Sequence, residues 1–150
     1  DLAYHVRHTA IPPPGVNAPT RQSASEFARY FYQALNDAFL SRDPSVLARV
    51  SSLQCASCQN FIKSVERLRQ NNESVDSFEI RLKFVAPGAI QGDSVRVDVG
   101  WDAAAVVRRD SQGKVLTRDA ALTCIEAQLQ LRLTAGAWRV SNYVRIRVRW

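Results

Sequence analysis

Cys55 and Cys58 are the residues whose spacing most clearly permits chemistry. They flank two residues at the predicted start of a helix, where the peptide dipoles lower the pKa of a thiol. A redox motif of the thioredoxin type would follow a strand in a βαβ unit, whereas residues 45–52 predict a helix. The pattern therefore favours a structural disulfide at a junction between helices, with redox chemistry and a reduced thiol pair as the alternatives.

The other metal-ligating side chains do not complete a zinc site around this pair. A closed site needs four ligands. Cys124 falls in a predicted strand, and the two histidines, His5 and His8, precede the pair by almost fifty residues. We expect no metal and no cofactor, and we expect Cys124 to be a small buried apolar residue.

Recognised catalytic motifs are absent from the sequence, including G-x-S-x-G, a phosphate-binding loop, G-x-G-x-x-G and H-E-x-x-H. Both histidines lie in a predicted tail, so neither is expected to act as a general base. Asp98 and Asp102 fall on the predicted polar face of a strand beside Arg96, which favours solvated ion pairs. No catalytic residue is assigned.

Two weaker patterns concern ligand binding. Asn142 occupies an even position, like the side chains of the last strand that are predicted to face the core. Either its amide lines a cavity or the strand has a bulge at this point, and the bulge is favoured. The residues that could line a cavity or contact a ligand are Tyr30, Tyr32, Trp101 and Asn142. Tyr143 begins a cationic ladder on the opposite face that could bind anions, formed by Arg145, Arg147 and Arg149, although a solvated strand is favoured.

The elements that position these residues begin with helices. Residues 1–22 are rich in proline and predict an extended leader or linker, followed by a single domain over residues 23–150. The capping box at residues 23–26 predicts the start of a long helix, which carries an aromatic stripe at three- and four-residue steps. Asp43-Pro44 predicts a second, short helix that ends near residues 51–52. A third helix is predicted to open around residues 55–58 and to be stopped by Asn71-Asn72.

From Val75 onward the hydrophobic period changes from about 3.6 to two. Alternation predicts strands with turns at 87–88, 110–113 and 135–136. The side chains predicted to face the core are Phe78, Ile80, Leu82, Phe84, Val95, Val97, Val99, Trp101, Ile125, Ala127, Leu129, Leu131, Leu133, Trp138, Val140, Val144, Ile146, Val148 and Trp150. Helices followed by alternating strands predict an α+β fold in which three helices pack on one face of a curved antiparallel sheet.

Composition narrows the class of protein. A chain of 150 residues accommodates one hydrophobic core, and no uninterrupted apolar stretch approaches the roughly 18 residues that span a bilayer. We therefore expect a soluble domain. The net charge of +6 comes mainly from arginine, but no zinc-finger spacing, RNA-binding signature or recognition helix accompanies it, so no specific nucleic-acid partner is expected.

Several local strings resemble an uncharacterised actinobacterial lipoprotein family. They are the aromatic stretch at residues 27–36, the segment 53–58 followed by Phe61-Ile62, and the late segment 137–140. The resemblance implies an extracytoplasmic domain in the cell envelope, anchored to the membrane through upstream sequence. It also implies that Cys55 and Cys58 are oxidised, as an exporting compartment favours.

The order of the elements is also similar to the nuclear transport factor 2-like (NTF2-like), cystatin-like cone, in which a curved sheet wraps a long first helix. This superfamily includes isomerases, dehydratases and interaction modules, so the fold fixes no activity. The leading hypothesis is a noncatalytic extracytoplasmic module that binds a protein or small ligand, with a homodimer through the sheet as a further expectation. The alternative is a small-molecule-binding, isomerase-like or dehydratase-like enzyme that uses the cone cavity.

Overall fold

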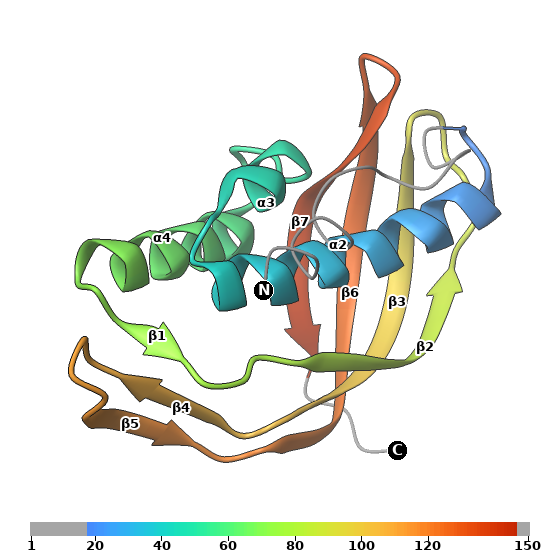
Figure 1. Ribbon diagram of the computed structural model, residues 1–150. Helices are drawn as coiled ribbons and strands as arrows, with labels where there is room; N and C mark the ends of the chain where they lie inside the picture. Colours follow the sequence, from blue (N-terminus) through green and yellow to red (C-terminus); the bar gives the residue numbers. More distant parts are fainter. Residues whose placement is uncertain (1–17, 147–150) are drawn as a thin grey trace.

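The computed structural model describes residues 18–146 and has the predicted α+β architecture (Figure 1). The helices are α2 (Arg21–Ser41), α3 (Ser45–Arg49) and α4 (Ala56–Gln70). The strands are β1 (Ser74–Val75), β2 (Ile80–Pro87), β3 (Ser94–Ala103), β4 (Val106–Arg109), β5 (Val115–Asp119), β6 (Leu122–Thr134) and β7 (Ala137–Ile146). The expected leader lies largely outside the described residues.

The main sheet has the order β2-β3-β6-β7, and each pair of neighbouring strands is antiparallel. Its curved inner face wraps α2, with α3 and α4 beside that helix (Figure 1). The core between them contains the predicted inner faces of α2, β3 and β6, including Phe31, Leu35, Val97 and Leu129. Between residues 18 and 146, no helix is long and apolar enough to cross a membrane.

The long helix begins earlier than the capping box predicted. Thr20 is the N-cap, and its Oγ1 accepts a hydrogen bond from the backbone N of Ser23 at 3.1 Å. Ser23 is instead buried in the first turn, where its hydroxyl oxygen accepts from Trp138 Nε1 at 2.8 Å. A hydroxyl engaged in the core is not available to cap the helix, so the predicted N-cap at Ser23 is wrong.

The second and third helices follow the sequence more closely. Asp43 Oδ1 accepts from the backbone N of Ser45 at 3.0 Å, which satisfies a free amide at the start of α3. Pro44 is the N-cap residue of α3 rather than its first helical residue. Cys55 is the N-cap of α4, and the helix ends at Gln70, one residue before the predicted stop at Asn71.

β-Bulges in β2 and β7 change which side chains face the core, so the predicted faces of these two strands are partly wrong. In β2 the register shifts between Leu82 and Phe84, so Lys83 is an extra residue. Beyond it Val85 is half-buried, whereas Phe84, which was predicted to face the core, is 37% exposed. In β7 the register shifts at Ser141, with a comparable exchange of faces that shapes the site described below.

A second, three-stranded antiparallel sheet with the order β1-β4-β5 was not predicted. The main sheet passes into it where β3 leads to β4 and β5 leads to β6 (Figure 1). At this bend Cys124 adopts a positive φ of 54°, and its backbone N donates to Asp102 Oδ1 at 3.0 Å. Cys124 is therefore a half-buried bulge residue and not the small buried apolar residue that was predicted.

Candidate ligand pocket

A pocket of about 690 Å³ opens between α4, the small sheet and the adjoining ends of the main strands. This volume is in the range typical of small-molecule sites. Most of the lining is apolar, and it includes Phe61 from α4, Trp101 and Ala103 from β3, and Leu122 from β6. Polar groups reach it from three elements: Ser57 and Asn60 on α4, Asp119 on β5, and Tyr143 and Arg145 on β7.

The bulge at Ser141 determines which β7 side chains face this pocket. Val140 pairs with Leu131, but Asn142 pairs with Gln130, so Ser141 is the extra residue of β7. Its hydroxyl donates to the carbonyl oxygen of Gln130 at 3.0 Å. The bulge favoured from the sequence is therefore present at this point of β7.

Beyond the bulge the inward residues have odd numbers instead of even numbers. Tyr143 pairs with the buried Leu129, and Arg145 pairs with the buried Ala127, so both lie on the inner face of the sheet. Val144 is 46% exposed on the outer face. The predictions that Val144 faces the core and that Tyr143 lies on the outer face are wrong, because the alternation of even and odd positions was carried unchanged through the bulge. Arg145 lies on the inner face at the edge of the pocket, but its side chain is exposed.

Three buried aromatic residues bring polar groups together at the pocket. The hydroxyls of Tyr32 and Tyr143 are 2.9 Å apart and share a hydrogen bond in which either can be the donor. Trp101 is only 5% exposed, and its Nε1 has no hydrogen-bond acceptor among the described residues. Phe61 packs edge-on against Tyr143, with ring centroids 5.5 Å apart.

Burial keeps both phenols protonated. Desolvation, with a smaller contribution from Tyr143, raises the pKa of Tyr32 well above its usual value. Desolvation also raises the pKa of Tyr143, although the hydroxyl of Tyr32 opposes this. The neighbouring indole N–H of Trp101 lowers the pKa of both phenols, although its Nε1 forms no hydrogen bond of standard geometry to either phenol oxygen. At neutral pH these groups are hydrogen-bond donors and not bases.

Arg145 brings positive charge to the same side of the pocket. Its guanidinium carbon lies 5.8 Å from the centre of the Trp101 ring, a cation–π distance. Within residues 18–146 no carboxylate forms an ion pair with Arg145. Arg147 and Arg149, the rest of the predicted ladder, lie outside the described residues.

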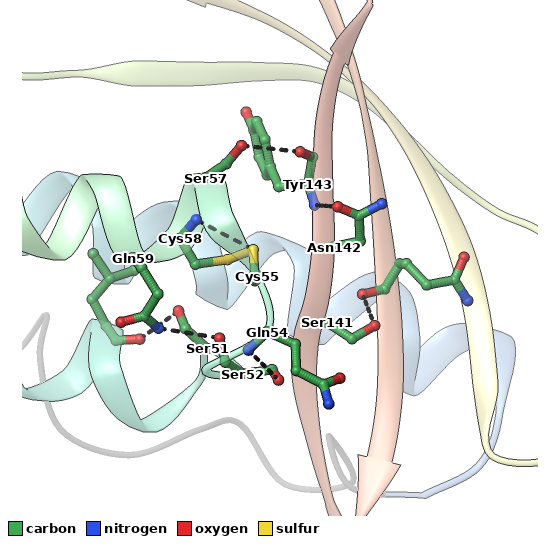
Figure 2. Close-up of a disulfide and its surroundings, with 12 residues drawn as sticks. Ser51, Ser52, Gln54, Cys55, Ser57, Cys58, Gln59, Ser141, Asn142 and Tyr143 are labelled. Atoms are coloured by element: carbon green, nitrogen blue, oxygen red, sulfur yellow. Dashed lines mark hydrogen bonds between the residues drawn. A yellow bond between two sulfur atoms is a disulfide. The ribbon is translucent and has the colours of Figure 1, made fainter.

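The Cys55–Cys58 pair fixes the helix that forms one wall. The two sulfurs are 2.13 Å apart, the distance of a disulfide, as the sequence favoured. Figure 2 shows this pair beside β7, where Ser57 Oγ donates to the carbonyl oxygen of Tyr143 at 3.1 Å. Ser57 lines the pocket, so the first turn of α4 joins the disulfide directly to it.

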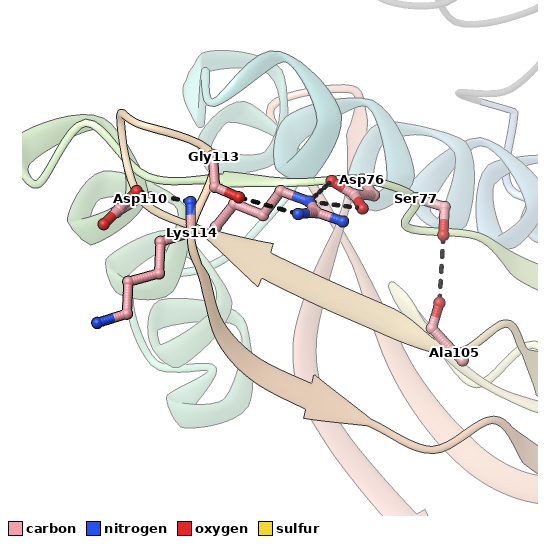
Figure 3. Close-up of polar contacts among 7 residues, drawn as sticks. Asp76, Ser77, Ala105, Asp110, Gly113 and Lys114 are labelled. Atoms are coloured by element: carbon pink, nitrogen blue, oxygen red, sulfur yellow. Dashed lines mark hydrogen bonds and ion pairs between the residues drawn. The ribbon is translucent and has the colours of Figure 1, made fainter.

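Strand β4 and the end of β5 form the opposite wall, which contains Val106 and Asp119. Ion pairs hold this small sheet together, since Arg109 Nε lies 2.9 Å from both carboxylate oxygens of Asp76. Figure 3 also shows Ser77 Oγ donating to the carbonyl oxygen of Ala105 at 3.2 Å. These contacts connect the segment around β1 to β4 and support the wall.

The remaining sequence candidates lie elsewhere. Tyr30 is buried on α2 but does not line the pocket, and burial raises its pKa. Tyr32 reaches the pocket only through its hydrogen bond to Tyr143. Asn142 is exposed, and its Oδ1 accepts from the backbone N of Tyr143 at 3.0 Å. The sequence did not identify Tyr143 as a lining residue. The available signal was Asn142, a polar residue at a position predicted to face the core, which indicated a bulge next to Tyr143.

Other chemical sites are limited in the part of the chain that the structure describes. No group of three or more His, Cys, Asp or Glu side chains could hold a metal ion there. Asp102 lies 3.1 Å from Lys83 and Asp98 lies 3.4 Å from Arg96, each measured between ion-pair atoms. These two aspartates are paired with cations and are not among the pocket-lining residues.

No protein-family model matches the chain, and no curated protein matches its sequence. Solved structures do resemble its fold. The intermembrane space region of the chloroplast protein ARC6 has a TM-score of 0.61 at 10% identity, covering 86% of this chain and 98% of that one. An NTF2-like superfamily protein from Salmonella enterica has a TM-score of 0.57 at 12% identity, covering 87% and 92%.

A third structure is an NTF2-like protein of unknown function in nutrient uptake from Rhodospirillum rubrum. Its TM-score is 0.51 at 13% identity, and the match covers 81% of this chain and 98% of that one. Together these likenesses confirm the NTF2-like fold that the order of elements predicted. The resemblance to actinobacterial lipoproteins stays a prediction.

Proposed function

We propose that this chain is a noncatalytic, extracytoplasmic module that binds a small, largely apolar molecule in the pocket beside α4. The single observation that supports this most strongly is the pocket itself, whose lining is mainly apolar with a few polar groups, among them Tyr143 and Arg145 on β7. A fold neighbour described as an NTF2-like protein of unknown function in nutrient uptake is consistent with this proposal.

The ionisable groups of the pocket favour binding over catalysis. Among the described residues that line the pocket, only Asp119 carries a carboxyl group, and its side chain is exposed. The raised pKa of Tyr143 disfavours its phenolate at neutral pH. An isomerase or dehydratase needs a group that accepts a proton from its substrate, and the described residues that line the pocket include no buried carboxylate and no histidine.

The proposed location rests on the cysteines and on the lipoprotein resemblance. Disulfides persist in oxidising compartments and are rare in the cytosol, so the Cys55–Cys58 bond supports export. The resemblance adds an upstream lipid anchor, which would hold the binding domain at the membrane surface. Both parts of this placement belong to the proposal.

Binding can be tested with N-phenyl-1-naphthylamine, a neutral fluorophore that brightens in apolar sites. We expect its fluorescence to increase with the wild-type protein and to stay low with Ala103→Phe, which places a ring in the pocket wall. Ala86→Phe is the matched control because Ala86 is exposed on β2 and does not line the pocket. Failure of the probe to bind, or equal binding to both variants, would contradict the proposal.

The alternative function is an isomerase-like or dehydratase-like enzyme. The observation that favours it is the buried phenol pair, since a protonated hydroxyl can polarise a bound carbonyl. Incubating the protein with an unsaturated cyclic ketone in D₂O would detect proton exchange next to the carbonyl by NMR. We expect exchange at the buffer rate, and faster exchange that Tyr143→Phe abolishes would favour the enzyme.

A further inference from the structure

The indole N–H of Trp101 is a buried donor that the described protein leaves without an acceptor. Its side chain is about 95% buried and lines the pocket. An N–H group buried without a partner destabilises the folded state, so native proteins rarely retain one. An acceptor supplied by a bound ligand accounts for this arrangement.

The phenol pair adds a second donor of the same kind. Tyr32 and Tyr143 each carry one O–H, and the bond between their oxygens uses only one of these two protons. Together with the indole N–H of Trp101, which makes no hydrogen bond to the described residues, the cluster has two protons to donate.

Arg145 gives this donor cluster a positive charge. The guanidinium lies over the Trp101 ring and has no ion-pair partner among the described residues. An anionic acceptor gains from both the charge and the hydrogen bonds, and charge-assisted hydrogen bonds are stronger than neutral ones. The rest of the lining, including Phe61 and Leu122, favours an apolar body.

We propose that the ligand is a small aromatic carboxylate, whose oxygens accept hydrogen bonds from Trp101 Nε1 and the Tyr143–Tyr32 hydroxyls while Arg145 neutralises its charge. This inference rests on the proposed binding function, and it adds the chemical class and the orientation of the ligand. The carboxylate lies toward β3 and β7, and the ring lies toward α4 and the start of β6.

A matched pair of ligands isolates the carboxylate. 2-Naphthoate and 2-naphthalenemethanol share the same ring system but differ in charge. We expect calorimetry to show that the protein binds the acid at least about tenfold more tightly than the alcohol, the difference that a charge-assisted hydrogen bond supplies. In ¹H–¹⁵N spectra, the Trp101 indole resonance should move downfield with the acid and much less with the alcohol.

Variants connect this preference to the named residues. Arg145→Gln and Trp101→Phe should each remove most of the preference for the acid. Arg139→Gln should keep it, because Arg139 is exposed on the same strand and does not line the pocket. Arg145 is itself exposed, so its substitution gives a test even if Trp101→Phe impairs folding.

The outcomes separate the two proposals. Equal affinity for acid and alcohol, or a preference that persists in Arg145→Gln, would overturn the carboxylate inference while leaving binding of the neutral naphthylamine intact. If neither the naphthalenes nor the naphthylamine bind, the proposed function fails and the carboxylate inference fails with it.

Discussion

Reduction of the Cys55–Cys58 disulfide should destabilise the protein by a modest and calculable amount. The two cysteines are three positions apart, so the bond closes a loop of only four residues. The chain-entropy model gives roughly 6 cal/mol/K for such a loop, or about 2 kcal/mol at 25 °C. For a protein of this size, that loss corresponds to a decrease in Tm of about 4–8 °C.

The assay is thermal unfolding followed by circular dichroism, with and without a reductant. Reduction is the cleaner perturbation, because substitution of either buried cysteine would also remove packing in the core. Cys124→Ala is the matched control and should respond to reductant as the wild type does. Cys55→Ala/Cys58→Ala should be insensitive to reductant, and thiol titration of unfolded, unreduced wild-type protein should count one reactive thiol, that of Cys124.

Two results would refute this reasoning. A Tm unchanged by reductant, together with three reactive thiols, would show that the pair is not oxidised. A loss far above 2 kcal/mol would show that the bond acts mainly by holding the native start of α4 against β7, because so small a loop has little more chain entropy to lose.

Three further predictions concern single side chains. Burial raises the pKa of Tyr32 and of Tyr143. The contribution of the protonated phenols to stability is therefore complete below about pH 10 and is lost as pH rises through the raised pKa values. Urea unfolding between pH 8 and 11 should show a decline in unfolding free energy that Tyr143→Phe reduces. Asp43→Ala should cost about 0.5–2 kcal/mol at neutral pH by removing the acceptor for Ser45. Because those hydrogen bonds lower the Asp43 pKa, the difference in unfolding free energy should begin to shrink near the ordinary value of 3.8 and should be lost as pH falls through the lowered pKa. Ala135→Asn should raise stability by up to about 1 kcal/mol, because Ala135 has a φ of 52° that asparagine tolerates better, and an unchanged or lower urea midpoint would contradict this.

The fold was predictable from the sequence in those elements whose apolar residues repeat with a regular helical or strand period and are buried in the core. Val95, Val97, Val99 and Trp101 alternate without interruption, and all four are buried as predicted. The change of period near Val75 correctly separated the helices from the strands. These elements are long and amphipathic, so their burial in the core determines their conformation regardless of local detail.

Bulges limited what alternation could predict. Phe84 is a large apolar residue at an inward parity, and nothing in the adjacent sequence indicates that Lys83 is inserted in the register. The small sheet was missed for a different reason. β4 is only four residues long and half-buried throughout, so the segment from Val106 to Arg109 has no alternating pattern to recognise.

The chemistry of the pocket follows from one inserted residue. Without Ser141, the even positions of β7 would continue inward, and Val144 and Ile146 would give the pocket a further apolar wall. With it, Tyr143 and Arg145 occupy the inner face beside Leu129 and Ala127. Strand β3 continues its alternation as far as Trp101, so this indole meets a phenol and a cation instead of two aliphatic side chains. A strand whose sequence predicts a solvated cationic face thus supplies the polar groups of a largely apolar cavity.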